Sequence, residues 1–98
     1  MANKQKALVS ITLGGKKRNI RFDLNALAEI EDAIGVPMSK MGEIELGVKT
    51  VRTMLWAGLI HENPELTERE VGSFVDFDNL EEVQTKVSEA FAAATAKN

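Results

Sequence analysis

Residues 8–35, LVSITLGGKKRNIRFDLNALAEIEDAIG, change their hydrophobic period part-way along, and this change decides the fold. In the first half, apolar side chains recur at every second position, as in a β-strand. Gly14-Gly15 suits a two-residue hairpin turn, because glycine reaches positive φ at little cost. In the second half the apolar residues recur at helical spacing. The stretch therefore predicts a β-hairpin over about residues 7–22 and a helix over about 24–34.

The two-residue turn also fixes the expected register of the hairpin, with Leu13 opposite Lys16. One face is then apolar and carries the stems of Lys16 and Arg18 at its tip. A lone hairpin is marginal in water, so this face has to rest on helices. Its expected members are Ala7, Val9, Ile11, Leu13, Ile20 and Phe22.

Capping signals and the spacing of apolar residues predict three further helices. Pro64 ends the first, because the residue before a proline avoids the helical region. Thr67 and Glu70 form a capping box that opens the second. Asn79 with Glu82 is a box-like start for the last. The expected helices cover about residues 48–61, 68–76 and 80–96.

The length indicates one domain over residues 1–98, and the hairpin followed by helices indicates an α+β fold. We expect the hairpin at 7–22 to pack on about four helices within a helical part at 23–96, with a frayed tail at 97–98. The chain has no cysteine, which excludes a disulfide scaffold and cysteine-ligated metal sites. No apolar stretch approaches the roughly 20 residues of a membrane span. The expectation is a protein of the cytoplasm with no membrane partner.

Charge is divided unevenly along the chain. Residues 1–22 hold six of the twelve basic residues and none of the fifteen acidic ones, so they carry +6 and residues 23–98 carry −9. We expect the basic hairpin to pair with acidic helices, in the same subunit or a neighbour. Binding of nucleic acid is disfavoured, because the domain is acidic overall and no aromatic residue is interleaved for stacking. The basic hairpin residues are Lys16, Lys17, Arg18 and Arg21.

The residues offer little for catalysis. His61 is the only histidine, and Glu62 follows it directly in the chain. Neighbouring residues on a helix point apart, so the two do not form a dyad. The doublet Gly14-Gly15 lacks the spacing of a phosphate-binding loop. The sequence therefore predicts no enzymatic activity, no catalytic residues, no cofactor and no metal.

Trp56 and Ile60 are the most informative apolar pair. They lie roughly 140–180° around the expected second helix from Val51, opposite its main apolar stripe. A helix that is apolar on both sides is either central in the fold or half in a partner interface. Both interpretations stay open, and the candidate partner-binding residues are Trp56, Ile60, Met38 and Met41.

Two stretches together resemble a known family. Residues 9–35 resemble the start of the small tail assembly chaperones of long-tailed phages and gene transfer agents. Residues 54–71, MLWAGLIHENPELTEREV, resemble the centre of that family, where a helix ends before a proline and a Thr-capped helix follows. The resemblance covers about residues 8–75. The connector at 36–47 and the last helix are similar to those of the family only in their general character.

The resemblance implies a non-catalytic morphogenesis factor of the host cytoplasm, made by a phage or prophage. Such a factor binds the long helical tape-measure protein and protects it until the tail tube polymerises. The tape-measure protein is thus the expected partner, and a homo-oligomer comes second. Two alternatives remain: a virion structural or tail completion protein, and a small nucleic-acid-binding regulator that uses the basic hairpin.

Overall fold

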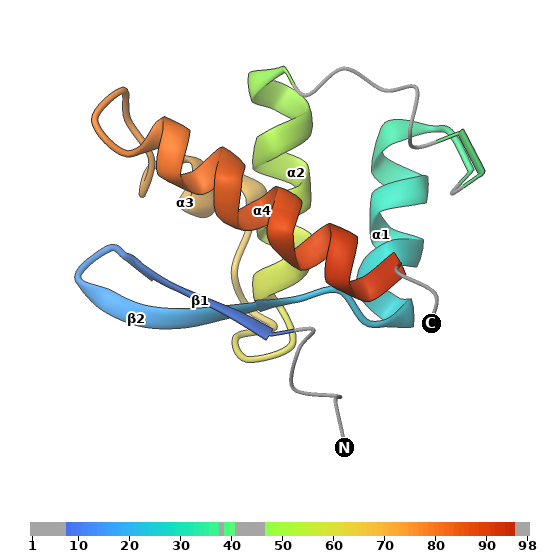
Figure 1. Ribbon diagram of the computed structural model, residues 1–98, viewed down its shortest axis with the longest axis horizontal. Coiled ribbons are helices and arrows are strands. Elements are labelled where there is room, and N and C mark those ends of the chain that lie inside the picture. Colours follow the sequence, from blue (N-terminus) through green and yellow to red (C-terminus); the bar gives the residue numbers. More distant parts are fainter. Residues whose placement is uncertain (1–7, 38, 41–46, 96–98) are drawn as a thin grey trace.

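A computed structural model describes residues 8–37, 39–40 and 47–95, and these residues form the predicted α+β fold (Figure 1). An antiparallel hairpin comes first in the chain and helices follow it, in the expected order. The strands are β1 (Leu8–Leu13) and β2 (Lys16–Arg21), and the helices within this part of the chain are α1 (Leu24–Ile34), α2 (Val48–Leu59), α3 (Glu68–Gly72) and α4 (Leu80–Thr95).

The hairpin has the predicted register, with Leu13 paired to Lys16 and Val9 to Ile20. Gly14 and Gly15 both have positive φ, 61° and 74°, as a type I′ turn requires. The predicted contact of Ala7 with Phe22 lies outside the described residues. Alternation along the two strands thus puts one row of apolar side chains on the inner face and a polar row on the outer face.

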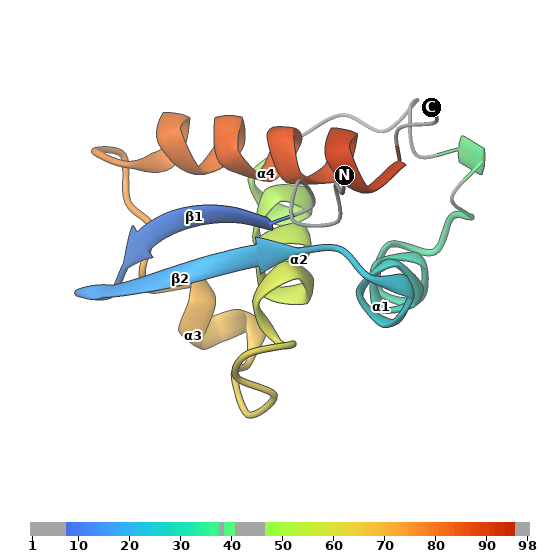
Figure 2. The ribbon, with the colours of Figure 1, turned by 60° about the horizontal axis from the view of Figure 1, so that its bottom comes forward.

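Two helices cover the inner face of the hairpin. Helix α4 runs lengthwise along both strands, while α2 crosses β2 and also contacts α1 and α3 (Figure 2). The two strands supply three buried apolar side chains, Phe22 directly after β2 adds another, and α4 supplies three from the predicted stripe. The buried core consists of Ile11, Leu13, Ile20, Phe22, Ala26, Ile30, Val51, Met54, Leu55, Ala57, Leu59, Val71, Val83, Val87 and Ala90.

Most of the predicted helix ends are confirmed. The Asp23 side chain accepts a hydrogen bond from the Ala26 backbone N–H at 2.9 Å and so caps α1. Gly35 ends that helix in the left-handed conformation, with φ 86°. Thr67 and Glu70 form both hydrogen bonds of the capping box that opens α3.

Two helix ends and one helix cap differ from the prediction. Helix α2 ends at Leu59, because the chain turns there and places the next side chains against β2. Helix α3 ends at Gly72, after which Phe74 packs beside the hairpin turn. The Asn79 side chain accepts a hydrogen bond from the backbone N–H of Asp76 at 2.8 Å, so it braces the preceding loop instead of forming the expected box.

Gly58 sets the distance between α2 and β2. A Cβ atom at this position would lie 2.6 Å from the Ile20 Cγ2 atom and 3.1 Å from the Phe22 ring. Real side chains do not approach so closely, so the helix reaches the strand only because residue 58 has no side chain. A glycine at this crossing therefore allows the two elements to share one core.

We expect Gly58→Ala to lower the free energy of unfolding by about 1–3 kcal/mol, because the added methyl group forces α2 away from β2. Gly72→Ala is the matched control. Its Cβ would meet the flexible Arg52 side chain at 3.0 Å, and alanine favours the helix by up to about 1 kcal/mol. Urea denaturation of both variants checks this, and equal stability of the two would contradict it.

Candidate functional site

The outer edge of β2 is closed by two side chains from the turn after α2. The His61 ring Nε2 lies 2.8 Å from the backbone carbonyl oxygen of Asn19 and donates to it. Glu62 accepts from the backbone N–H of Asn19 at 3.2 Å and from the Asn19 side-chain amide at 2.8 Å. These side chains take the place of a neighbouring strand. His61 and Glu62 thus act together as an edge cap, and both bind Asn19.

Hydrogen bonding lowers the pKa of Glu62 below its ordinary value. The side-chain amide of Asn19 is the largest cause, and its backbone N–H adds to the effect. The positive charges of His61 and Arg18 act in the same direction, and burial opposes them. A lowered pKa in the folded state means that the ionised carboxylate stabilises the fold at neutral pH.

Arg18 is an internal part of the fold. Its side chain is 9% exposed, and its Nε donates a hydrogen bond to the Leu13 backbone carbonyl at 3.0 Å. Its guanidinium carbon lies 4.6 Å from the centre of the Phe74 ring, a cation–π arrangement. The other basic hairpin residues, Lys16, Lys17 and Arg21, are exposed. The predicted basic cluster therefore presents three cations to solvent, and the fourth ties the hairpin tip to the loop after α3.

The expected pairing of the hairpin with acidic residues takes an indirect form. The amide of Asn19 on β2 binds the carboxylate of Glu62. The ion pair of Arg52 with Glu68, at 3.5 Å, instead joins α2 to α3. Thr53 donates to the same carboxylate at 2.9 Å and strengthens that junction. Partly exposed pairs of this kind contribute about 0–1 kcal/mol each.

Trp56 and Ile60 are both half-buried. Trp56 packs against the core, and its indole Nε1 donates to the Leu66 backbone carbonyl at 3.0 Å. The indole thereby fixes the loop that leads to α3, which favours the interpretation of Trp56 as a residue of the fold. Met38 and Met41, the other two candidate partner-binding residues, lie outside the described residues.

An apolar groove lies on another side of α2, between its first half, α3 and the start of α4. It has a volume of about 740 Å³. Phe77 is 93% exposed and Val48 is 67% exposed, unusual values for such large apolar side chains. The apolar residues that line the groove are Val48, Val51, Leu55, Val71, Val75, Phe77 and Leu80.

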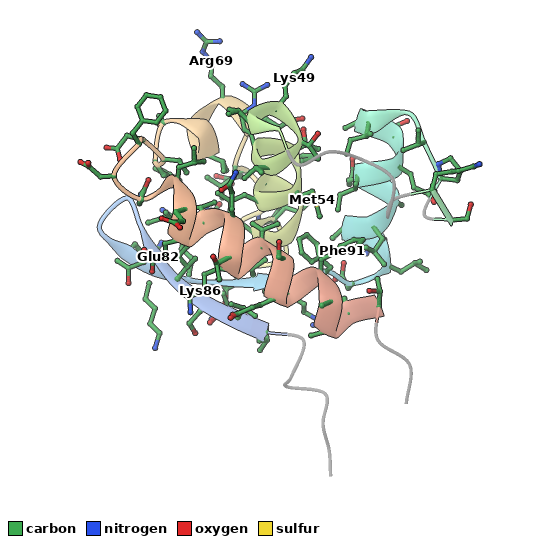
Figure 3. The ribbon with its side chains drawn as sticks, turned by 45° about the horizontal axis from the view of Figure 1, so that its top comes forward. Lys49, Met54, Arg69, Glu82, Lys86 and Phe91 are labelled. Atoms are coloured by element: carbon green, nitrogen blue, oxygen red, sulfur yellow. The ribbon has the colours of Figure 1, made fainter. Side chains whose placement is uncertain are left out.

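The rim of the groove carries charge of both signs. Arg52 and Arg69 line it together with Asp76. The stem of Arg52 packs beside Gly72, where an added Cβ would lie 3.0 Å from the Arg52 Cδ atom. Lys49 at the start of α2 and Arg69 on α3 project from the same border of the molecule (Figure 3). The groove thus combines an apolar floor with a border that carries two arginines and one aspartate.

The groove was missed in the sequence, although a signal was present. Phe77 stands between Asp76 and Asp78, in the segment VDFDN before α4. A phenylalanine flanked by aspartates outside any helix or strand has no regular face through which to enter a core. Such a residue is a candidate for partner contact.

Neither known families nor known structures add to this description. No protein-family model, no curated protein and no solved structure matches the chain. In the described ranges, three or more histidine, cysteine or carboxylate side chains do not gather into a group that fits a metal ion. The helices in the same ranges are too short or too polar to cross a bilayer. The resemblance to tail assembly chaperones therefore stays a prediction.

The low pKa of Glu62 predicts a pH-dependent contribution to stability. Glu62→Gln should lower the free energy of unfolding at neutral pH by less than about 1 kcal/mol, because the site is exposed. The difference from wild type should begin to shrink as the pH falls through about 4.3, the ordinary pKa of glutamate, because the unfolded chain takes up the proton there first. It should vanish only at lower pH, where the folded carboxylate is protonated as well. Thermal denaturation across this range measures the difference. Glu65→Gln in the same loop is the control, and a difference that stays constant with pH would refute the assignment.

The indole contact predicts a structural role for Trp56. Trp56→Phe should lower the free energy of unfolding by about 1 kcal/mol through loss of the hydrogen bond to Leu66. Trp56→Ala should cost more, because it also removes half-buried apolar surface. Both are measured by urea denaturation followed by circular dichroism. Wild-type stability in both variants would instead indicate that Trp56 belongs to a partner-binding face.

Proposed function

We propose that this chain is a non-catalytic tail assembly chaperone that binds the tape-measure protein of a long-tailed phage or prophage and protects it during assembly in the host cytoplasm. The observation that carries the proposal is the apolar groove between α2, α3 and α4. Its exposed Phe77 and Val48 are the kind of surface that a protein partner covers. The resemblance of residues 8–75 to the chaperone family supplies the identity of that partner.

The shape of the groove supports a helical ligand. Its floor runs along α2 from Val48 to Leu55, a rise of about 10 Å at 1.5 Å per residue. That length matches two turns of a bound helix, whose apolar residues would insert between Phe77 on one side and α2 on the other. Long helical proteins such as the tape-measure protein present many such segments, which remain exposed until the tail tube encloses them.

The charge of the rim specifies the ligand further. Arg52, which also pairs with Glu68, and Arg69 line the groove, and Lys49 and Arg69 both project from the same border of the molecule (Figure 3). A helix with acidic residues next to its apolar stripe would place them against this border. Such charges steer the encounter and fix the orientation of the helix more than they add to affinity.

Replacement of the exposed phenylalanine tests this function. Phe77→Ser should leave the free energy of unfolding within about 0.5 kcal/mol of wild type, because the ring makes little contact with the fold. Capture of the tape-measure protein, co-expressed from the same phage genome, should fall at least several-fold. Leu24→Ser is the matched control, since Leu24 is also a highly exposed apolar residue, at 81%, and lies on α1 away from the groove.

Three other outcomes would count against the proposal. Equal capture by Phe77→Ser and wild type would exclude the groove as the binding site. Presence of the chain in purified virions would favour a structural or tail completion protein. Tight DNA binding that weakens steeply with salt, and is lost when Lys16 and Lys17 are replaced by Glu, would favour the regulator.

A further inference from the structure

The two edges of the hairpin differ, because side chains from the turn after α2 cap the edge of β2. Ser10 and Asn19 are paired across the two strands. The backbone N–H and C=O of Asn19 bond outward to Glu62 and His61, so this is a pair whose backbone groups point away from the partner strand. The backbone groups of Ser10 therefore point outward from the opposite edge, that of β1. In an antiparallel ladder the same holds for Leu8 and Thr12, because the pattern alternates.

The edge of β1 has features that favour pairing with another strand. In the part of the chain that the structure describes, the sheet has two strands, so β1 forms one of its edges. Its sequence, LVSITL, contains no charge and no proline, the two commonest devices that block an edge. Ser10 and Thr12 are exposed, and Leu8 is 42% exposed. The other edge, β2, carries four basic residues and is capped at its centre.

We propose that β1 is a self-association site, at which two copies of this chain join their hairpins into one four-stranded antiparallel sheet. The two copies are related by a two-fold axis that passes beside Ser10. The second copy's Ser10 then lies opposite Ser10, and its Thr12 lies opposite Leu8. In this register the backbone groups of Leu8, Ser10 and Thr12 in each β1 strand all face an outward-pointing residue of the other copy. Any other antiparallel register leaves at least one of these residues without such a partner.

Side-chain chemistry agrees with this register. Val9, which is half-buried in one copy, comes to lie opposite the second copy's Ile11 on the inner face, and such β-branched cross-strand pairs stabilise a sheet. On the outer face, Ser10 and Thr12 offer hydroxyl groups at the junction. No like charges meet across the axis, because β1 is uncharged. Pairing through β2 would instead bring the exposed Lys16, Lys17 and Arg21 of both copies together.

The edge cap on β2 makes the assembly finite. In the joined sheet the strand order is β2, β1, then β1 and β2 of the second copy. Both outer edges are β2 strands, and each is closed at Asn19 by its own His61 and Glu62. Growth therefore stops at two copies, as expected for an isologous interface. This inference is independent of the proposed function, because it uses a different surface from the groove.

The two-fold axis gives a specific test at residue 10. Wild type should form a dimer, with about twice the 10.7 kDa mass of one chain, by light scattering or sedimentation. Ser10→Lys and Ser10→Glu should each be monomeric, because each places like charges directly opposite one another. An equal mixture of the two variants should regain the dimer mass, because Lys then faces Glu. Circular dichroism verifies that each variant is folded.

Ser10→Ala is the matched control. It removes the hydrogen bond of Ser10 to the Asn19 side chain, 2.8 Å long, but adds no charge, so the dimer should persist. Three results would overturn the proposal: a monomeric wild type up to its solubility limit, dimers of both charged variants alone, or a mixture of folded variants that stays monomeric. Dimers that break with Phe77→Ser but not with Ser10→Lys would assign self-association to the groove.

Discussion

The contact of α2 with β2 at Gly58 is the constraint on which the rest of the molecule depends. Because the helix lies directly on Ile20 and Phe22, its last turn ends beside the strand. His61 and Glu62 then fall within reach of Asn19. The opposite, N-terminal half of α2 extends beyond the hairpin and meets α3 and the start of α4, where the groove forms. One close packing contact therefore positions both the closed edge and the open groove.

Much of the fold follows from local rules that the sequence displays. The hairpin register depends on a two-glycine turn, and the ends of α1 depend on Asp23 and Gly35. Such signals act over a few residues and need no knowledge of the rest of the chain. The end of α3 does not follow from them. It depends on Phe74, which leaves the helix to pack against Arg18 from a distant part of the chain.

The candidate site was harder to predict than the fold, for a physical reason. Helical periodicity shows that α2 is apolar on two sides, but it does not show which side the remaining elements cover. Trp56 looked suited to a partner, yet Leu66 satisfies its indole N–H. The strand pattern places the stem of Arg18 on the apolar face of the hairpin, but it does not show that the Phe74 ring lies against the guanidinium at the hairpin tip. Each of these outcomes depends on a neighbour that is remote in sequence.

The position of α4 in the chain has a consequence for folding during synthesis. Val83, Val87 and Ala90 cover the inner face of the hairpin, whose first strand begins at Leu8. Ribosomes add about 5–20 residues per second, so the inner face of β1 emerges several seconds before the helix that shields it. During this interval the nascent chain displays an apolar, uncharged strand. The rate at which α4 emerges and docks then sets how long the chain is exposed to misassembly.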